Sequence, residues 1–218
     1  MTALHHLRAF TAATVLAVLT ITASGCAAPE PSYTALDDAA MMKLFPTETE
    51  IKTALGDVES VTGPSAQIPD PSASPPANTV SSTECYEASF GTAESRADVP
   101  TRMFAMQSSD SDGTSYRWVV AQRPSADDIR KGRSAYEDRV RKCSSYETFD
   151  AGTTSGNNFA ARPSGEGKVP SEGASAYVTS GNVSIQFTVL GPFEEAKELV
   201  KKMAPVMEKR LKASAPKS

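Results

Sequence analysis

The clearest pattern in the sequence is the alternation of apolar and polar residues over positions 183–190. Alternation with a period of two is typical of a β-strand that has one buried and one exposed face. Positions 174–179 are also suited to a strand, and the turn-forming sequence SGN at 180–182 lies between the two segments. The pattern therefore predicts a β-hairpin.

A second hairpin is predicted over positions 102–122, where two strand-like segments flank the acidic turn DSDG at 110–113. We interpret Trp118 in its second strand as a core residue rather than a ligand-binding one. An acidic turn can bind calcium, but this one lacks the further ligands and the distant glutamate of an EF-hand loop, so we favour a plain turn. Shorter strands are predicted at 85–90, 146–151 and 158–161.

Apolar residues at helical spacing predict one long helix after each hairpin. The first follows Ser125, a preferred N-cap residue, and ends at Cys143. The second covers positions 192–212, and we expect Pro205 to kink or weaken it because proline removes a backbone hydrogen bond. Its apolar stripe consists of Ala196, Leu199, Met203, Met207 and Leu211.

Positions 36–55 predict one helix broken at Pro46, or two short helices. Thr47 and Glu50 have the spacing of a capping box. Positions 63–82 contain five prolines and few apolar residues, which predicts a loop or linker.

Together these elements predict a single α+β domain over positions 36–212. Hairpin followed by helix occurs twice, at 102–143 and at 174–212. We expect a two-layer sandwich in which an antiparallel sheet has helices packed on one face.

The first 25 residues predict a cleavable signal peptide rather than part of the domain. Their apolar run at 9–21 is shorter than the ~20 residues that cross a bilayer. Small residues at 23–25 precede Cys26, an arrangement that resembles the bacterial lipobox. The resemblance implies that Cys26 carries acyl chains such as palmitate and is the first residue of the mature chain. An ordinary secretory peptide and an uncleaved membrane span are the alternatives.

Acylation would hold the domain on the extracytoplasmic face of the cell membrane, since two acyl chains anchor a protein stably. Positions 26–35 contain small residues and prolines and a single charged residue, Glu30. This composition predicts a short extended tether.

Composition excludes several classes of function. The formal net charge is −4, and both histidines, His5 and His6, lie in the predicted signal peptide. The mature chain would have no histidine for a catalytic triad or an imidazole zinc site, and we expect no metal or cofactor. A mildly acidic chain also lacks the concentrated basic face that nucleic-acid binding requires.

A hydrolase could still use carboxylates alone, as glycosidases do. The candidate pairs are Asp127-Asp128 and Glu194-Glu195. Both pairs fall in the first turn of a predicted helix, where the helix dipole already favours negative charge. We therefore expect a protein without enzymatic activity.

Cys85 and Cys143 remain once Cys26 is assigned to the lipid. An even pair in an exported protein indicates a disulfide. Two free thiols at a redox or metal site are the alternative, although C-x-x-C spacing is absent.

The segment MMKLFPTETEIKTALGD at 41–57 resembles the opening of actinobacterial lipoproteins related to the extracellular sensor domain of the kinase PknH. Cys85 and a helix that ends in Cys143 fit the same layout. The resemblance covers roughly positions 36–212 and implies an α+β domain with a ligand-binding cleft. The chain has one cysteine pair where the kinase sensor has two, and other actinobacterial lipoproteins with a similar layout are a competing match.

We therefore expect a sensor-like domain that binds an envelope ligand or a protein partner. A structural or adhesive envelope protein without a small-molecule site is the alternative. An amphiphilic ligand could bind between the sheet and the helices, with Met203 and Met207 as weak candidate contacts because methionine adapts to varied shapes. The other interpretation is that both methionines complete the core.

Overall fold

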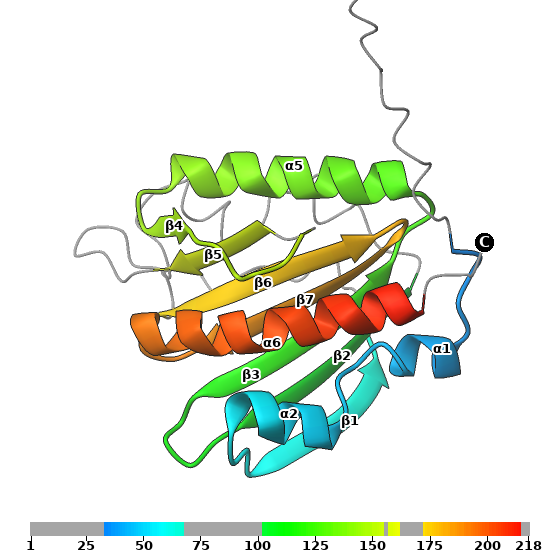
Figure 1. Cartoon of the computed structure of the whole chain (residues 1–218). Coiled ribbons are helices and arrows are strands. Elements are labelled where there is room, and N and C mark those ends of the chain that lie inside the picture. The colour runs from blue at the N-terminus through cyan, green and yellow to red at the C-terminus, as the bar shows by residue number, and fades with distance from the viewer. Residues whose placement is uncertain (1–32, 68–101, 155–156, 162–171, 215–218) are drawn as a thin grey trace, which may run out of the picture.

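The computed structural model describes residues 33–67, 102–154, 157–161 and 172–214. These residues form an antiparallel sheet of seven strands in the order β1-β2-β3-β7-β6-β5-β4 (Figure 1). The strands are β1 (Ser60–Ala66), β2 (Arg102–Ser109), β3 (Ser115–Gln122), β4 (Tyr146–Thr148), β5 (Asn157–Ala161), β6 (Gly173–Ser180) and β7 (Val183–Leu190). The helices are α1 (Asp38–Met42), α2 (Glu48–Leu55), α5 (Ala126–Lys142) and α6 (Phe193–Ala213). The predicted α+β class is confirmed.

The two predicted hairpins form the centre of the sheet. β6 and β7 pair along their full lengths, from Gly173 opposite Leu190 to Ser180 opposite Val183. β2 and β3 pair in the same way, and β3 and β7 join the two hairpins side by side. Because side chains alternate along each strand, the register places most of the buried apolar residues of the four strands on one face.

Trp118 lies at the middle of this apolar face. Its side chain is fully buried, and its ring stacks on Phe187 of β7 with 4.8 Å between the ring centroids. Phe187 also stacks on Tyr116, two residues before Trp118. The prediction that Trp118 belongs to the core is confirmed.

The acidic turn between β2 and β3 is stabilised by its own side chain. Asp110 Oδ1 accepts hydrogen bonds from the backbone N–H groups of Asp112 (3.1 Å) and Thr114 (2.9 Å). Its Oδ2 accepts a hydrogen bond from the hydroxyl of Tyr116 (2.8 Å). The acidic residue thus serves to close the turn, and Gly113 has the positive φ of 85° that this turn requires.

α6 lies across β6 and β7, as Figure 1 shows, and supplies the largest share of the helical core. The helix runs from Phe193 to Ala213 with Pro205 inside it, so the proline does not end the helix, and the predicted kink or weakening stays a prediction. Pro205 points to solvent, where its ring does not disturb the packing of the opposite face. Burial of an apolar face supplies most of the stability of a helix in a protein, which is consistent with a helix that continues past the proline.

α5 packs on the other face of the sheet. Lys197 of α6 forms an ion pair with Glu147 of β4 (2.7 Å), so Glu147 points to the α6 face. The neighbouring Tyr146 points the opposite way, because successive side chains of a strand alternate. Tyr146 packs with Tyr136 and Val140 of α5. The helices α2 and α6 therefore share one face, as predicted, whereas α5 covers the other face near the β4 edge.

β1 extends into the region predicted to be a loop. Positions 63–66 of the expected 63–82 loop belong to this edge strand. Its register shifts between Thr62 and Ser65, at Gly63 and Pro64. Glycine and proline at a bulge of an edge strand are tolerated, but they conceal the strand in the sequence. The strand predicted at 85–90 lies outside the described residues, and β4 is shorter than the predicted 146–151.

Candidate functional site

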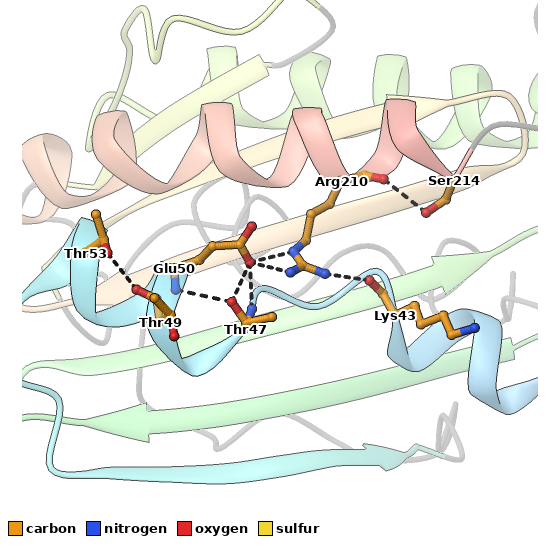
Figure 2. Close-up of polar contacts among 7 residues, drawn as sticks. All are labelled: Lys43, Thr47, Thr49, Glu50, Thr53, Arg210 and Ser214. Atoms are coloured by element: carbon orange, nitrogen blue, oxygen red, sulfur yellow. Dashed lines mark hydrogen bonds and ion pairs between the residues drawn. The ribbon is translucent and has the colours of Figure 1, made fainter.

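A cluster of polar side chains joins α1 and α2 to α6 (Figure 2). Arg210 of α6 contacts Glu50 Oε2 through Nε (2.7 Å) and Nη2 (2.5 Å). Its Nη1 donates a hydrogen bond to the backbone carbonyl of Lys43 (2.9 Å), just after α1. One guanidinium thus connects α6 to the neighbouring helices α1 and α2, which are distant from α6 in the sequence.

Glu50 also caps its own helix. Thr47 accepts a hydrogen bond from the backbone N–H of Glu50, and Glu50 Oε2 accepts one from the backbone N–H of Thr47 (2.8 Å). The predicted capping box is confirmed. Burial would raise the pKa of Glu50, but the hydrogen bonds from Thr47 and Arg210 outweigh it and lower the pKa below the usual range. The carboxylate is therefore ionised at neutral pH.

This geometry suits a structural contact better than catalysis. The guanidinium of Arg210 is directed at Glu50 and at a carbonyl, so it does not offer a vacant fork to an anion. A carboxylate with a lowered pKa is also a poor general acid at neutral pH. We call the group of Lys43, Thr47, Glu50 and Arg210 the α2–α6 clasp, because it holds the first helices against α6.

A second carboxylate, on the buried residue Glu208, ties a loop to α6. Glu208 accepts a hydrogen bond from the backbone N–H of Thr154 (2.9 Å) and another from its hydroxyl. Lys212 lies 3.3 Å from the same oxygen. Burial would raise the pKa of Glu208, but the Thr154 hydrogen bonds and Lys212 lower it overall. These contacts hold the loop that follows β4 against the C-terminal part of α6.

The chain enters the domain earlier than predicted. Tyr33 is buried, its N–H donates to Asn182 Oδ1 (3.0 Å), and its hydroxyl donates to the carbonyl of Leu211 (3.2 Å). Gln122 contacts the next residues, accepting from the N–H of Leu36 (2.9 Å). Residues 33–35 of the expected 26–35 tether therefore belong to the domain. The partners are far away in the sequence, so local composition could not reveal them.

The predicted ligand contacts lie inside the core. Met203 and Met207 are fully buried on the side of α6 that packs against the sheet. Both methionines thus complete the core, the second of the two interpretations. One polar atom of this layer stands out, because the buried indole N–H of Trp118 has no hydrogen-bond acceptor. An orphaned buried donor of this kind costs about 1–3 kcal/mol.

The two carboxylate pairs lie at opposite ends of the sheet. α5 begins after Gln122, which is opposite Val183, whereas α6 begins after Leu190 at the far end of the same strand. Asp128 accepts a hydrogen bond from its N-cap residue Ser125, and Asp127 pairs with Arg130. Glu194 lies 3.5 Å from Lys197. The pairs Asp127-Asp128 and Glu194-Glu195 therefore do not face each other across a cleft.

The remaining predicted sites are only partly described. Cys143 is buried at the end of α5 and is disulfide-bonded, with a partner outside the described residues. Its pairing with Cys85 stays a prediction, and Cys26 also lies outside the described part. None of the described helices has the length and apolar character needed to cross a membrane. Within the described ranges, His, Cys, Asp and Glu side chains form no group of three that could hold a metal ion.

Comparison with known proteins identifies a shared fold. No protein family and no curated protein matches the sequence. Among solved structures, the chain is similar to the extracellular domain of PknH from Mycobacterium tuberculosis, with a TM-score of 0.58 and 17% sequence identity. The similarity covers 82% of this chain and 100% of that domain. The PknH-like fold implied by the segment at 41–57 is confirmed.

Proposed function

We propose that this protein is a cell-envelope lipoprotein, anchored through Cys26 on the extracytoplasmic face, whose folded domain binds a ligand or partner without catalysis. The observation that carries the proposal is the similarity to the PknH extracellular domain over that domain's whole length. The lipobox-like residues before Cys26 support an anchor of acyl chains on that cysteine. The absence of histidine after position 6 removes the commonest general base from the folded domain.

The layer between the sheet and the helices α2 and α6 is the place proposed for ligand binding. It is lined by apolar side chains, and it contains the unpaired indole N–H of Trp118. An amphiphilic molecule could bury its chain among the apolar groups and give an oxygen to that N–H. Because the layer is closely packed, such a ligand enters only when the α2–α6 clasp opens.

The anchor is tested by metabolic labelling. Cells that express the protein are grown with a palmitate analogue, and we expect label on the wild-type chain and none on Cys26→Ser. Label that persists on the variant would contradict anchoring through Cys26.

Ligand binding is tested with protein purified from its own envelope. Native mass spectrometry should show a mass above that of the acylated polypeptide, and lipid extracts should shift the emission of Trp118, the single tryptophan of the chain. Arg210→Met opens the clasp and should increase the bound fraction. The matched control is Lys209→Met, which removes an exposed charge from the neighbouring position. Equal occupancy of both variants would contradict entry through the clasp.

A structural or adhesive role is the second candidate. The full burial of Met203 and Met207 favours it, because the core is closed around them. It predicts that only the acylated polypeptide is recovered and that lipid extracts leave the melting temperature unchanged.

A further inference from the structure

The contacts of Tyr33 fix the point where the tether leaves the domain. Its backbone N–H is bound to Asn182 in the β6–β7 turn, and Asn182 Nδ2 donates in return to the carbonyl of Tyr33 (3.0 Å). The tyrosine hydroxyl is bound to Leu211, near the end of α6. The tether therefore starts at the end of the sheet that carries the β6–β7 turn.

The tether is short in comparison with the domain. Tyr33 is the seventh residue after Cys26, so even a fully extended chain spans no more than about 25 Å between them. The 21 residues of α6 extend about 32 Å. If Cys26 is acylated, as the proposed function requires, the end of the sheet at Tyr33 is the end nearest the lipid.

α1 lies at this same end. Asp38 of α1 forms an ion pair with Arg102 (2.6 Å), and Arg102 is paired across the sheet with Gln122, which binds Leu36. Figure 1 shows α1 beside the start of the described chain and the C-terminal end of α6.

α1 also carries the exposed hydrophobic residue of this end. The large hydrophobic residues exposed in the described part of the chain are Met42, Val61 and Leu190. Val61 is opposite Ser108 and Leu190 is opposite Ser115, so both lie toward the far end of the sheet. Among the described residues, Met42 is thus the large exposed apolar side chain at the end of the sheet nearest the lipid.

The outward face of α1 is suited to lipid headgroups. Met41 points into the core, whereas Ala39, Met42 and Lys43 are exposed. The acidic residues of this helix are engaged within the protein, since Asp37 accepts a hydrogen bond from the N–H of Ala40 (2.7 Å) and Asp38 pairs with Arg102. A methionine beside a lysine can insert shallowly while the ammonium group contacts lipid phosphates.

We infer that α1 is a membrane-contact element that rests on the bilayer through Met42 and Lys43 and orients the domain on the lipid surface. The inference depends on the proposed anchoring at Cys26. It also implies that the opposite end of the sheet, with the β2–β3 turn, points away from the membrane.

Hydrogen exchange on membranes tests this arrangement. Protein purified from bacteria that express the full chain is reconstituted into vesicles of phosphatidylcholine and phosphatidylglycerol, and exchange is compared with that in detergent. We expect backbone exchange in residues 38–45 to slow several-fold on vesicles, with no change in the β2–β3 turn. Unchanged exchange in residues 38–45 of a vesicle-bound protein would overturn the inference.

Two matched variants sharpen the test. Met42 and Leu190 are each 43% exposed, so Met42→Glu and Leu190→Glu make the same change at opposite ends of the sheet. Met42→Glu should lose the slowing in α1 while it stays bound through its anchor, and Leu190→Glu should keep it. Equal behaviour of the two variants counts against α1 as the contact.

Failure of the anchor gives a different result. A wild-type protein that does not float with vesicles would contradict acylation, and its free Cys26 thiol can then be coupled to a maleimide-bearing lipid. The coupled protein has the same tether, so the exchange of residues 38–45 still decides whether α1 contacts the bilayer.

Discussion

α5 and α6 both follow a hairpin, and yet they relate to the sheet in different ways. α6 crosses the central strands and buries nine residues. α5 buries only Ile129 and Val140 within its helical span, and it packs on the opposite face near β4. The repeated order of hairpin and helix therefore does not produce two equivalent halves.

The difference shows what each helix depends on. α6 is held by continuous apolar packing and by the charged contacts of Glu50 and Glu208 at its C-terminal half. α5 is mostly polar along its exposed side, and its C-terminal end is fixed by the small cluster around Val140 and by the disulfide of Cys143. A cavity in the apolar core should therefore destabilise the packing of α6 most. Loss of the disulfide at Cys143 should mainly loosen the C-terminal end of α5.

The largest effect is expected from a cavity under α6. Met207→Ala should lower the free energy of unfolding by about 2–5 kcal/mol, because Met207 is fully buried and truncation leaves a cavity. Urea denaturation followed by Trp118 fluorescence measures the loss. Met42→Ala is the matched control, since this methionine is exposed and its truncation should change stability by no more than about 0.5 kcal/mol. Similar losses for the two variants would contradict the assigned core.

The two helices also show which features of this fold the sequence predicts. Local patterns predict the helices, but not the face of the sheet on which each helix packs. Period-two alternation at 183–190 and the Thr47–Glu50 capping box specify structure locally, and both elements occur as expected. The face on which α5 packs and the burial of Tyr33 depend on contacts between distant residues, such as Tyr33 with Asn182. The spacing of Thr47 and Glu50 predicts the cap, but the pairing of Glu50 with Arg210, 160 positions away, has no local signal. The sequence therefore predicts the helices and strands better than it predicts the contacts of the candidate site.

A smaller effect is expected from the covalent link of α5. Joint replacement of Cys85 and Cys143 by serine should lower the free energy of unfolding by about 2–4 kcal/mol, since the open chain gains conformational entropy when unfolded. Trp118 lies on the other face of the sheet, so its native emission should stay the same while the disulfide-free protein becomes more sensitive to protease near α5. Non-reducing peptide mapping of the wild type identifies the pairing. Recovery of Cys85 as a free thiol would contradict it.

The smallest effect concerns the charged contacts of α6 and depends on pH. The pKa values of Glu50 and Glu208 are lowered in the folded protein, so both carboxylates stabilise it above the pKa of the unfolded chain. This stability is lost as the pH falls from about 4.5 through the lower folded values. We expect the melting temperature to fall in this range, and calorimetry between pH 6 and pH 3 measures it.

Substitution at Glu50 separates the clasp from the general effect of acid. Glu50→Gln keeps the size of the side chain and removes the charge that faces Arg210, so it should cost about 1 kcal/mol at neutral pH. The cost should vanish at low pH, where the wild-type carboxyl is also neutral. Glu48→Gln on the same helix removes only the exposed pair with Lys52 and should have little effect at either pH. If Glu50→Gln lost the same stability at pH 3 as at pH 7, the loss would reflect packing or capping geometry, and the ion pair with Arg210 would contribute nothing to holding α2 on α6.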